Sequence, residues 1–463
     1  MPTASRYDTI LFTMEWEEYQ KKCYLLSRYR DRYLSDKSFE EKTASLIAEG
    51  MNFPEGIAYM EAMMGRTGEY EKADILWAPI LIYVGDPLCY GVLDSFGRLL
   101  GEALTRLGET VEYYDIGKND ISGLADFVGL RFTAVIGMQS YAFAVTLGDG
   151  TNLHDKIIGP KYNMIFDHPV WLRDHLENGP KDYYVLTHDN FYVNFVKLYF
   201  QKVKGAYLLP PGGVKPESFS VGTDREYPLS FVGSYHDWRL WKGQLREADK
   251  KTHGVARAYL NYMLHHRDIT WEEGLSDVLL DRGESVYGDA FRDLLFEIKP
   301  VCFIVMSYIR EKIIDAIAES GIELHVFGES WNHPRFAGFN NIIRHPEVTP
   351  AESLEIYRRS LASLNIMSWH KGGMTERLAN MMLQGALVIT DTSEYISEHY
   401  EAGEDYVEIS LEDIDSIPGT ISDIISDREK IRNMTHSAYE KASGRETWDD
   451  RAEKLRWILC ERL

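Results

Sequence analysis

The sequence predicts an α/β protein with two doubly wound domains, in which buried parallel strands alternate with helices. The chain of 463 residues is too long for a single hydrophobic core. Its 44% hydrophobic and 26% charged residues are typical of a globular protein. Short apolar runs alternate with amphipathic stretches of helical length in two places, at residues 80–116 and 364–390. Each place is expected to form one β-α-β unit of a separate sheet.

The first unit begins with a buried strand at Ile80–Val84. An amphipathic stripe then runs from Val92 to Leu107 and ends at Gly108, ahead of a strand at Thr110–Ile116. Further strands are predicted at Ala134–Met138, Met164–Phe166, Tyr183–Thr187 and Ala206–Leu209. Ligands of such sheets bind at the carboxyl ends of the strands. The polar residues at those ends are Asp86, Gln139, Ser140, Asp167, His168, His188 and Asp189.

The second unit lies within Ser363–Val407, where an apolar run at Leu364–Met367 predicts a buried strand. A helix fits Met374–Gln384, because its apolar residues recur on one face. Gly385 is expected to end this helix, ahead of a strand at Ala386–Thr390. Around this unit we predict strands at Leu229–Val232 and Ile322–Phe327, a charged helical insertion at residues 238–296, a helix at Tyr308–Ala318 and a capped helix start at Thr349.

The turn between the strand and the helix of the second unit predicts an anion site. A helix N-terminus offers unpaired N–H groups and a partial positive charge. Gly372 and Gly373 would allow a ligand close to the backbone, and Lys371 adds a full charge. We therefore expect a diphosphate against the turn, with Glu376 accepting hydrogen bonds from ribose hydroxyls and Arg377 close by. The alternative is a plain strand–helix turn in which Glu376 only complements the helix dipole.

The residues of this unit also carry a resemblance. Leu364-Asn365, the glycine turn, Glu376-Arg377, Gly385-Ala386, Thr390-Asp391 and Gly403-Glu404 together resemble the donor-binding half of GT-B glycosyltransferases. More narrowly, they resemble the bacterial group related to the spore-maturation protein CgeB and to flagellin-modifying transferases. The runs FDHPVWLRDHL, LTHDNFYVNFVKLYF and YLLPPGGV extend the resemblance over most of residues 160–463. The chain departs from the group at Pro211, where a histidine more often precedes the glycine pair.

The resemblance implies a GT-B fold, in which two Rossmann-like domains face a cleft. The expected divisions are a helical extension at 1–74, an acceptor domain at 75–222, a donor domain at 223–445 and a helix at 446–463 that crosses back to the first domain. The donor-binding residues implied are Gly233, Ser234, Arg310, His345, His370, Lys371, Gly372, Gly373, Met374, Thr375, Glu376 and Arg377. The loop Arg344–Val348 is expected to hold the nucleotide base.

Glycosyl transfer requires that the leaving phosphate be neutralised, either by a metal or by fixed dipoles and cations. Asp413 and Asp415 have the spacing of an Asp-x-Asp motif, but their acidic helix-start context favours a solvated cap. The sequence therefore predicts a metal-independent enzyme with no cofactor. The resemblance implies a nucleotide-diphosphate sugar as the donor, and we expect it to be UDP-linked.

A general base is expected from the first domain, and His168 beside Asp167 is the first choice, with Asp86 next. His188 and Asp189 are held in reserve. The alternative is that His168 caps or packs within a His-Pro turn. His370 is expected either to meet the phosphate or the sugar, or to be an exposed loop histidine.

The net charge of −22 disfavours nucleic acid and anionic membranes as partners. The four scattered cysteines, the lack of a long apolar run and the absence of a signal-like N-terminus lead us to expect a cytoplasmic protein without membrane insertion. The resemblance implies transfer to Ser or Thr of a protein such as flagellin or a spore-surface protein. Two alternatives stay open: a sugar-nucleotide 2-epimerase, and a non-catalytic assembly factor that binds a sugar nucleotide.

Overall fold

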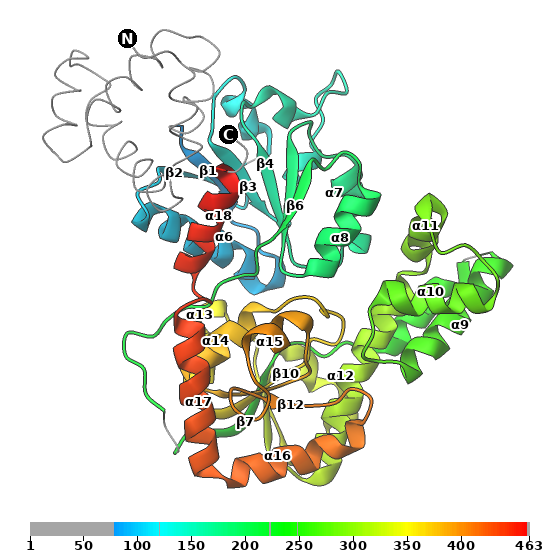
Figure 1. The fold of residues 1–463 in the computed structure, drawn as a ribbon, viewed down its shortest axis with the longest axis vertical. Helices are drawn as coiled ribbons and strands as arrows, with labels where there is room; N and C mark the ends of the chain where they lie inside the picture. The colour runs from blue at the N-terminus through cyan, green and yellow to red at the C-terminus, as the bar shows by residue number, and fades with distance from the viewer. Residues whose placement is uncertain (1–77, 120, 222–223, 248, 461–463) are drawn as a thin grey trace, which may run out of the picture.

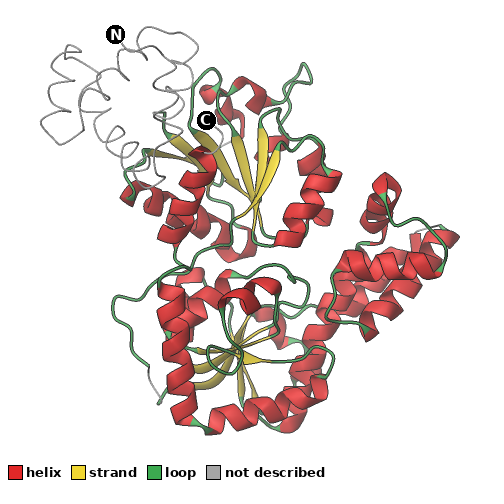
Figure 2. Ribbon diagram, viewed as in Figure 1, coloured by secondary structure: helices red, strands yellow, loops and turns green. Residues whose placement is uncertain are grey.

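The computed structural model describes residues 78–460 apart from 120, 222–223 and 248. The helical extension predicted before residue 75 lies outside the described residues. Within them the chain forms two parallel sheets of six strands each, with helices packed on the sheet faces (Figures 1 and 2). The prediction of two doubly wound domains is therefore confirmed.

The first sheet has the strand order β2-β1-β3-β4-β5-β6, and all neighbours are parallel. Its strands are β1 (Ile80–Val84), β2 (Val111–Asp115), β3 (Ala134–Met138), β4 (Lys161–Ile165), β5 (Tyr183–Thr187) and β6 (Gly205–Leu208). Its helices are α6 (Leu88–Arg106), α7 (Arg173–Glu177) and α8 (Asn190–Tyr199). Strands β1, β3 and β5 have the predicted bounds, because each is a fully buried apolar run between turn residues.

The second sheet has the order β12-β11-β10-β7-β8-β9 and is also parallel. Its strands are β7 (Tyr227–Val232), β8 (Leu324–Phe327), β9 (Ile342–His345), β10 (Ser360–Asn365), β11 (Leu387–Thr390) and β12 (Val407–Glu408). Its helices are α12 (Pro300–Ser320), α13 (Pro350–Arg359), α14 (Glu376–Gln384), α15 (Glu394–His399), α16 (Ile417–Ser426) and α17 (Arg428–Ser443). Chain order reverses between β7 and β10, and the carboxyl ends of these two strands are where such a sheet binds ligands.

Strand β10 begins earlier than the predicted Leu364–Met367 and ends before its last two residues. The serines that hid it from the apolar pattern are buried and satisfied inside the sheet. Ser360 Oγ donates to Ser230 Oγ at 2.8 Å, and Ser230 Oγ donates to Ser363 Oγ at 2.9 Å. The helix after it, α14, starts at Glu376 rather than Met374, and it ends as predicted at Gly385, whose φ of 75° is left-handed.

The charged insertion forms a helical arm beside both domains, defined here as residues 249–299 (Figure 1). It contains α9 (Lys250–His265), α10 (Trp271–Asp281) and α11 (Gly288–Ile298), and it follows the short helical segment η5 (Trp238–Glu247). Contacts of α11 with α8 on one side and with α12 on the other connect the arm to both sheets.

The last helix, α18 (Trp448–Cys460), lies against α6 of the first domain (Figure 1). Trp448 and Leu455 join the core that surrounds Leu100. The two chain crossings between the domains meet where Gly213 N donates to Glu446 O at 2.6 Å. A Cβ on Gly212 would lie 2.6 Å from the Trp448 backbone nitrogen, so the glycine pair after Pro211 is required where these crossings touch.

No helix in the described part of the chain combines the length and the apolar character that a membrane span requires.

Candidate functional site at the facing ends of the two sheets

The carboxyl ends of the two sheets face each other. After β5, residues 188–192 contact residues 369–374, which follow β10, and Asp189 and Gly373 form an antiparallel bridge between the domains. We call these two segments the interdomain contact. Because strands within each sheet are parallel, the loops after β4 and β7 lie on the same two edges. Most predicted site residues are on these loops.

Two arginines of the second domain converge beside the carboxyl end of β7. Arg310 of α12 is 7% exposed, and its Nη1 donates to Ser234 O at 2.7 Å. Arg377 of α14 directs its Nη1 to Val232 O at 3.4 Å. A Cβ on Gly233 would come within 3.2 Å of the Arg377 Nη1, so glycine there leaves room for the guanidinium. This grouping agrees with the predicted donor residues.

Neither guanidinium has a carboxylate within ion-pair distance among the described residues. Arg310 Nε is buried and makes no hydrogen bond to another described residue. Burial, and secondly the charge of Arg377, lower the pKa of Arg310 to about 9. Two positive groups held together without an acidic partner form a site for an anion with several oxygens, such as a diphosphate.

The start of α14 adds polar groups to this region. Thr375 is the N-cap, but its hydroxyl makes no capping bond, and its Oγ1 is buried without a partner among the described residues. Glu376 is half-buried in the first turn of the helix. Burial raises the pKa of Tyr357 of α13, while the charge of Arg377 lowers this pKa and that of Glu376 raises it. The ribose-binding role of Glu376 stays a prediction.

The glycine turn has a different structural reason from the one expected. Gly372 N donates to Asp189 Oδ2 at 2.9 Å, so a carboxylate of the first domain already occupies this N–H group. A Cβ on Gly373 would lie 1.9 Å from His188 O, and one on Gly372 would lie 2.7 Å from Asp189 Oδ1. The two glycines are therefore needed for backbone contact between the domains, not only for approach of a ligand.

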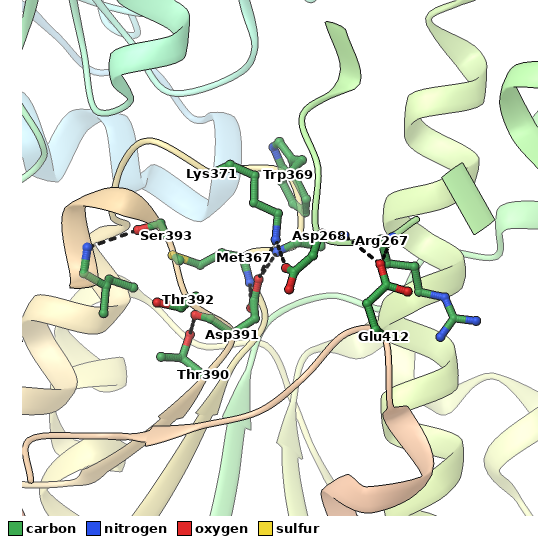
Figure 3. Close-up of polar contacts among 12 residues, drawn as sticks. Arg267, Asp268, Met367, Trp369, Lys371, Thr390, Asp391, Thr392, Ser393 and Glu412 are labelled. Carbon is green, nitrogen blue, oxygen red and sulfur yellow. Dashed lines mark hydrogen bonds and ion pairs between the residues drawn. The ribbon is translucent and has the colours of Figure 1, made fainter. Parts of the chain in front are cut away.

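Lys371 is not the free cation that the sequence predicts. Its Nζ lies 2.7 Å from Asp268 Oδ1 on the arm and 3.7 Å from Asp391 Oδ2 after β11 (Figure 3). The Lys371 side chain is 8% exposed, so both carboxylates act on a largely desolvated ammonium. The excess positive charge near β7 comes instead from Arg310 and Arg377.

Asp391 shapes the loop that leads from β10 to α14. Its Oδ1 accepts a hydrogen bond from Met367 N at 2.7 Å, and its Oδ2 accepts one from Ser368 N at 2.9 Å (Figure 3). Ser368 has a φ of 48°, a left-handed conformation that non-glycine residues rarely adopt. Burial raises the pKa of the Asp391 carboxyl, while Lys371 and the two N–H groups oppose that rise.

His370 is neither exposed nor aimed at open solvent. It is 5% exposed, and its Nδ1 lies 2.9 Å from His188 Nε2 and 3.0 Å from Tyr192 Oη. Burial, followed by the charges of neighbouring histidines, Arg377 and Lys371, holds the pKa of His370 well below its ordinary value. Burial also lowers the pKa of His188 to about 4. This histidine pair is therefore neutral and belongs to the interdomain contact.

His168 adopts the arrangement of the alternative reading. Its Nδ1 accepts a hydrogen bond from Val170 N at 3.1 Å, which caps the turn at Pro169. Its Nε2 lies 2.9 Å from Glu272 Oε1 on the arm. Both ring nitrogens are thus engaged, and the ring is 2% exposed. This is the geometry of a capping histidine, and the role of His168 as the general base stays a prediction.

Asp167 is the acidic group that remains accessible at the end of β4. Its side chain is exposed, and its Oδ2 accepts a hydrogen bond from Gln139 Nε2 at 2.8 Å. Protein atoms crowd it on the remaining sides, and the resulting desolvation raises the pKa of its carboxyl. Gln139 is itself held at a left-handed φ of 48°, with its Oε1 accepting from Phe166 N at 3.1 Å. Asp86, the third candidate, is buried after β1.

His345 is the last residue of β9 and is partly buried, so Arg344 and His345 belong to a strand rather than to the loop predicted at Arg344–Val348. The base-binding role stays a prediction. The His345 ring stacks on Phe327 at a centroid distance of 4.3 Å, and its Nε2 lies 2.9 Å from His325 Nδ1. Asp413 and Asp415 are exposed beside a short helical turn. Among residues 78–460 that are described, no group of three His, Cys, Asp or Glu side chains is arranged to hold a metal ion.

Sequence reasoning missed Asp268 and Glu272, because the insertion that carries them showed only a charged helical pattern. The available signal was local: Thr270 and Glu273 form a capping box, which fixes the start of α10 directly between these two carboxylates.

Comparisons with known proteins bear on the second domain. Residues 310–456 match the family described as "Glycosyl transferase-like", a segment that runs from Arg310 through the loop between β10 and α14 into α18. No curated protein matches the sequence.

Three solved structures illustrate the likeness of the fold. Sucrose-phosphate synthase from Thermosynechococcus elongatus has 12% identity and a TM-score of 0.50, covering 83% of this chain and 98% of that chain. An alpha-glucosyltransferase in complex with UDP and a 13-mer DNA has 11% identity and a TM-score of 0.49, with coverage of 82% and 99%. Anabaena Alr3699/HepE in complex with UDP has 11% identity and a TM-score of 0.46, with coverage of 83% and 100%.

The sheet topology and the likeness to the synthase establish the GT-B fold for the described residues. The family match adds that residues 310–456 are similar to glycosyl transferase-like proteins.

The neutral histidine pair predicts acid sensitivity. With a folded pKa of about 4 and an unfolded pKa of about 6.5, the unfolded state binds more protons between these values, so stability falls as pH is lowered. Through His188 alone, the free energy of unfolding should be about 2 kcal/mol lower at pH 5 than at pH 8. We expect the melting temperature of His188→Gln to depend less steeply on pH than that of the wild type. His436→Gln, at an exposed histidine, should keep the full dependence, and equal slopes for all three proteins would contradict the prediction.

Proposed function

We propose that the chain is a glycosyltransferase that moves a sugar from a UDP-linked donor to an acceptor hydroxyl. The observation that carries the proposal is the pair Arg310 and Arg377, which converge without a carboxylate beside the strand ends where a doubly wound sheet binds ligands. The match of residues 310–456 to a glycosyl transferase-like family supports glycosyl transfer as the reaction.

In this reaction the bond between the anomeric carbon and the diphosphate oxygen breaks as the acceptor oxygen bonds to that carbon. Negative charge accumulates on the leaving diphosphate. Arg310 and Arg377 are preorganised to stabilise that charge in a partly dry site, where charge interactions are strong. Thr375 and the N-terminus of α14 add donors for the same oxygens.

On the acceptor side we assign the proton-accepting role to Asp167. It lies at the end of β4, on the sheet edge that meets the second domain, and Gln139 orients its carboxyl. Its raised pKa makes it a stronger base than an ordinary carboxylate. His168 and Glu272 would hold the turn that follows Asp167.

For the acceptor we propose Ser or Thr hydroxyls of a bacterial protein such as flagellin or a spore-surface protein. The resemblance of the sequence to protein-modifying transferases supports this class. The net charge of −22 disfavours acceptors held on anionic membranes or in nucleic acid. An epimerase would instead return a changed nucleotide sugar, and a non-catalytic binding protein would return the donor unchanged.

The donor assignment predicts that Arg310→Met weakens binding of UDP by about 10- to 100-fold, since a hydrogen bond to a charged group is lost. Because the wild-type charge is buried without an acidic partner, the melting temperature should be equal to or higher than that of the wild type. Isothermal titration with UDP and UDP-glucose measures the affinity. Lys312→Met, a partly exposed cation on the same helix, is the control and should bind normally. Equal affinities of wild type and Arg310→Met would rule out this site.

The acceptor assignment predicts that Asp167→Asn lowers turnover about 10²- to 10⁴-fold while UDP affinity is unchanged, because a general base acts only on the acceptor. Turnover is followed with a labelled donor, and lysate protein or liposomes with polyprenyl phosphate serve as acceptors. Label is expected in protein, and label found only in lipid would reject the protein acceptor. A loss of UDP binding in Asp167→Asn would instead reject the role given to Asp167.

The proposed charge neutralisation by arginines and helix dipole predicts that turnover persists in excess EDTA. Turnover that disappears with EDTA and returns with Mn²⁺ or Mg²⁺ would show that a metal ion takes part.

A further inference from the structure

One short segment of the arm holds a residue of each domain. Glu272 Oε1 lies 2.9 Å from His168 Nε2 in the first domain, and Asp268 Oδ1 lies 2.7 Å from Lys371 Nζ in the second. Residues 268–272, which we call the bridging segment, include both carboxylates. The segment thus contacts the turn after Asp167 and the loop before α14 at the same time (Figure 3 shows the Lys371 end).

The bridging segment is fixed by its own contacts. Thr270 Oγ1 accepts from Glu273 N, and Thr270 N donates to Glu273 Oε2, which completes the capping box of α10. Trp271 is 4% exposed, packs its ring against His168 at 4.9 Å and accepts a hydrogen bond from Tyr259 at its carbonyl. These contacts hold the segment in one conformation, so a shift at one end moves the other end as well.

The second domain also anchors the segment through its backbone. Glu412 Oε1 accepts hydrogen bonds from the backbone N–H groups of Arg267 and Asp268, and Arg267 Nη1 donates to Leu411 O at 3.0 Å (Figure 3). The Asp268–Lys371 ion pair and the His168–Glu272 hydrogen bond are shielded, since Lys371 is 8% exposed and His168 is 2% exposed. Salt screens a shielded ion pair less than a surface pair.

We propose that the bridging segment sets the spacing of the two domains at the transfer site, with Asp268 and Glu272 as positioning residues. The inference rests on the proposed function for its catalytic consequence only. The interdomain contact holds the domains together at residues 188–192 and 369–374, and the two chain crossings meet at Gly213 and Glu446. The bridging segment adds a further connection, from Lys371 of the interdomain contact to His168 of the first domain.

This arrangement makes a specific demand on additivity. Changes at distant sites with no shared partner normally multiply in their effects. Because the segment carries position only while both ends are held, loosening the second end adds less than loosening the first. If Asp268 and Glu272 act only on their own neighbours, their effects should instead multiply.

The test compares Asp268→Asn, Glu272→Gln, the double variant and, as control, Asp281→Asn at the exposed end of α10. With UDP-glucose as the donor and UDP release as the readout, each single variant should lose about 3- to 30-fold in kcat, a range typical of coupled residues. The double variant should lose about as much kcat as the more impaired of the two single variants. The KM for UDP-glucose should change little, and the control should match wild type. A double variant whose loss is the product of the single losses would overturn the proposal.

Hydrogen exchange gives a readout that does not depend on catalysis. Backbone amides of residues 186–193 lie on the first-domain side of the interdomain contact. Asp268 touches the other side of that contact, at Lys371. These amides should exchange faster in all three variants by a similar factor and at the wild-type rate in Asp281→Asn. Faster exchange confined to the loop that each variant contacts would refute the proposal even if the chain proves not to be a transferase. Failure of UDP to bind the wild type would instead refute the proposed function alone.

Discussion

Backbone contact between the two domains is the constraint on which the rest of the site depends. A parallel sheet presents all its carboxyl ends along one edge, so two such sheets form a shared site only if those edges are brought together. Gly373 against the His188 carbonyl brings them together, at a separation that admits no Cβ atom. Once this contact is made, the loop from β10 to α14 takes its shape from both domains.

Carboxylates of both domains fix the shape of that loop by accepting hydrogen bonds from its backbone. Asp189 binds Gly372 N from the first domain, and Asp391 binds Met367 N and Ser368 N from the second. Burial raises the pKa of Asp189 to about 6. The backbone N–H groups that donate to its carboxylate favour the charged form and oppose that rise. Asp391 also pairs with Lys371, together with Asp268 of the arm. Arg310 and Arg377 beside β7 are then the positive groups without a carboxylate partner among the described residues.

The sequence predicted those parts of the structure that depend on local pattern. Strands β1, β3 and β5 are uninterrupted apolar runs, and the capping box at Thr349 and the left-handed Gly385 determine helix ends through neighbouring residues alone. Strand β10 escaped because its serines are satisfied by other serines across the sheet. The hydroxyl pattern of one strand does not reveal the partner strand that neutralises it.

The predictions for the site differ in outcome for the same reason. A histidine before a proline looks alike whether it serves as a base or as a cap, and for His168 the decision comes from Glu272, far along the chain. Two glycines before a helix suit a phosphate or a neighbouring backbone equally well, and the segment around His188 determines which contact they make here. Lys371 likewise could not be recognised as neutralised without Asp268.

Arg310 and its neighbour Glu311 show how a structural charge differs from one held for a ligand. The Glu311 carboxylate accepts hydrogen bonds from Tyr235, Trp238 and Arg239, and these groups lower its pKa to about 2 although burial opposes that shift. Arg310 follows the same helix into the interior, where its hydrogen-bond acceptor among the described residues is the Ser234 carbonyl and its guanidinium lies over the Phe231 ring. A guanidinium buried without a carboxylate destabilises the fold, because its lost hydration is not replaced. The chain supplies acidic partners to Arg239 and Arg335 nearby, whereas Arg310 and Arg377 have none among the described residues. An anionic ligand is the partner that would complete it.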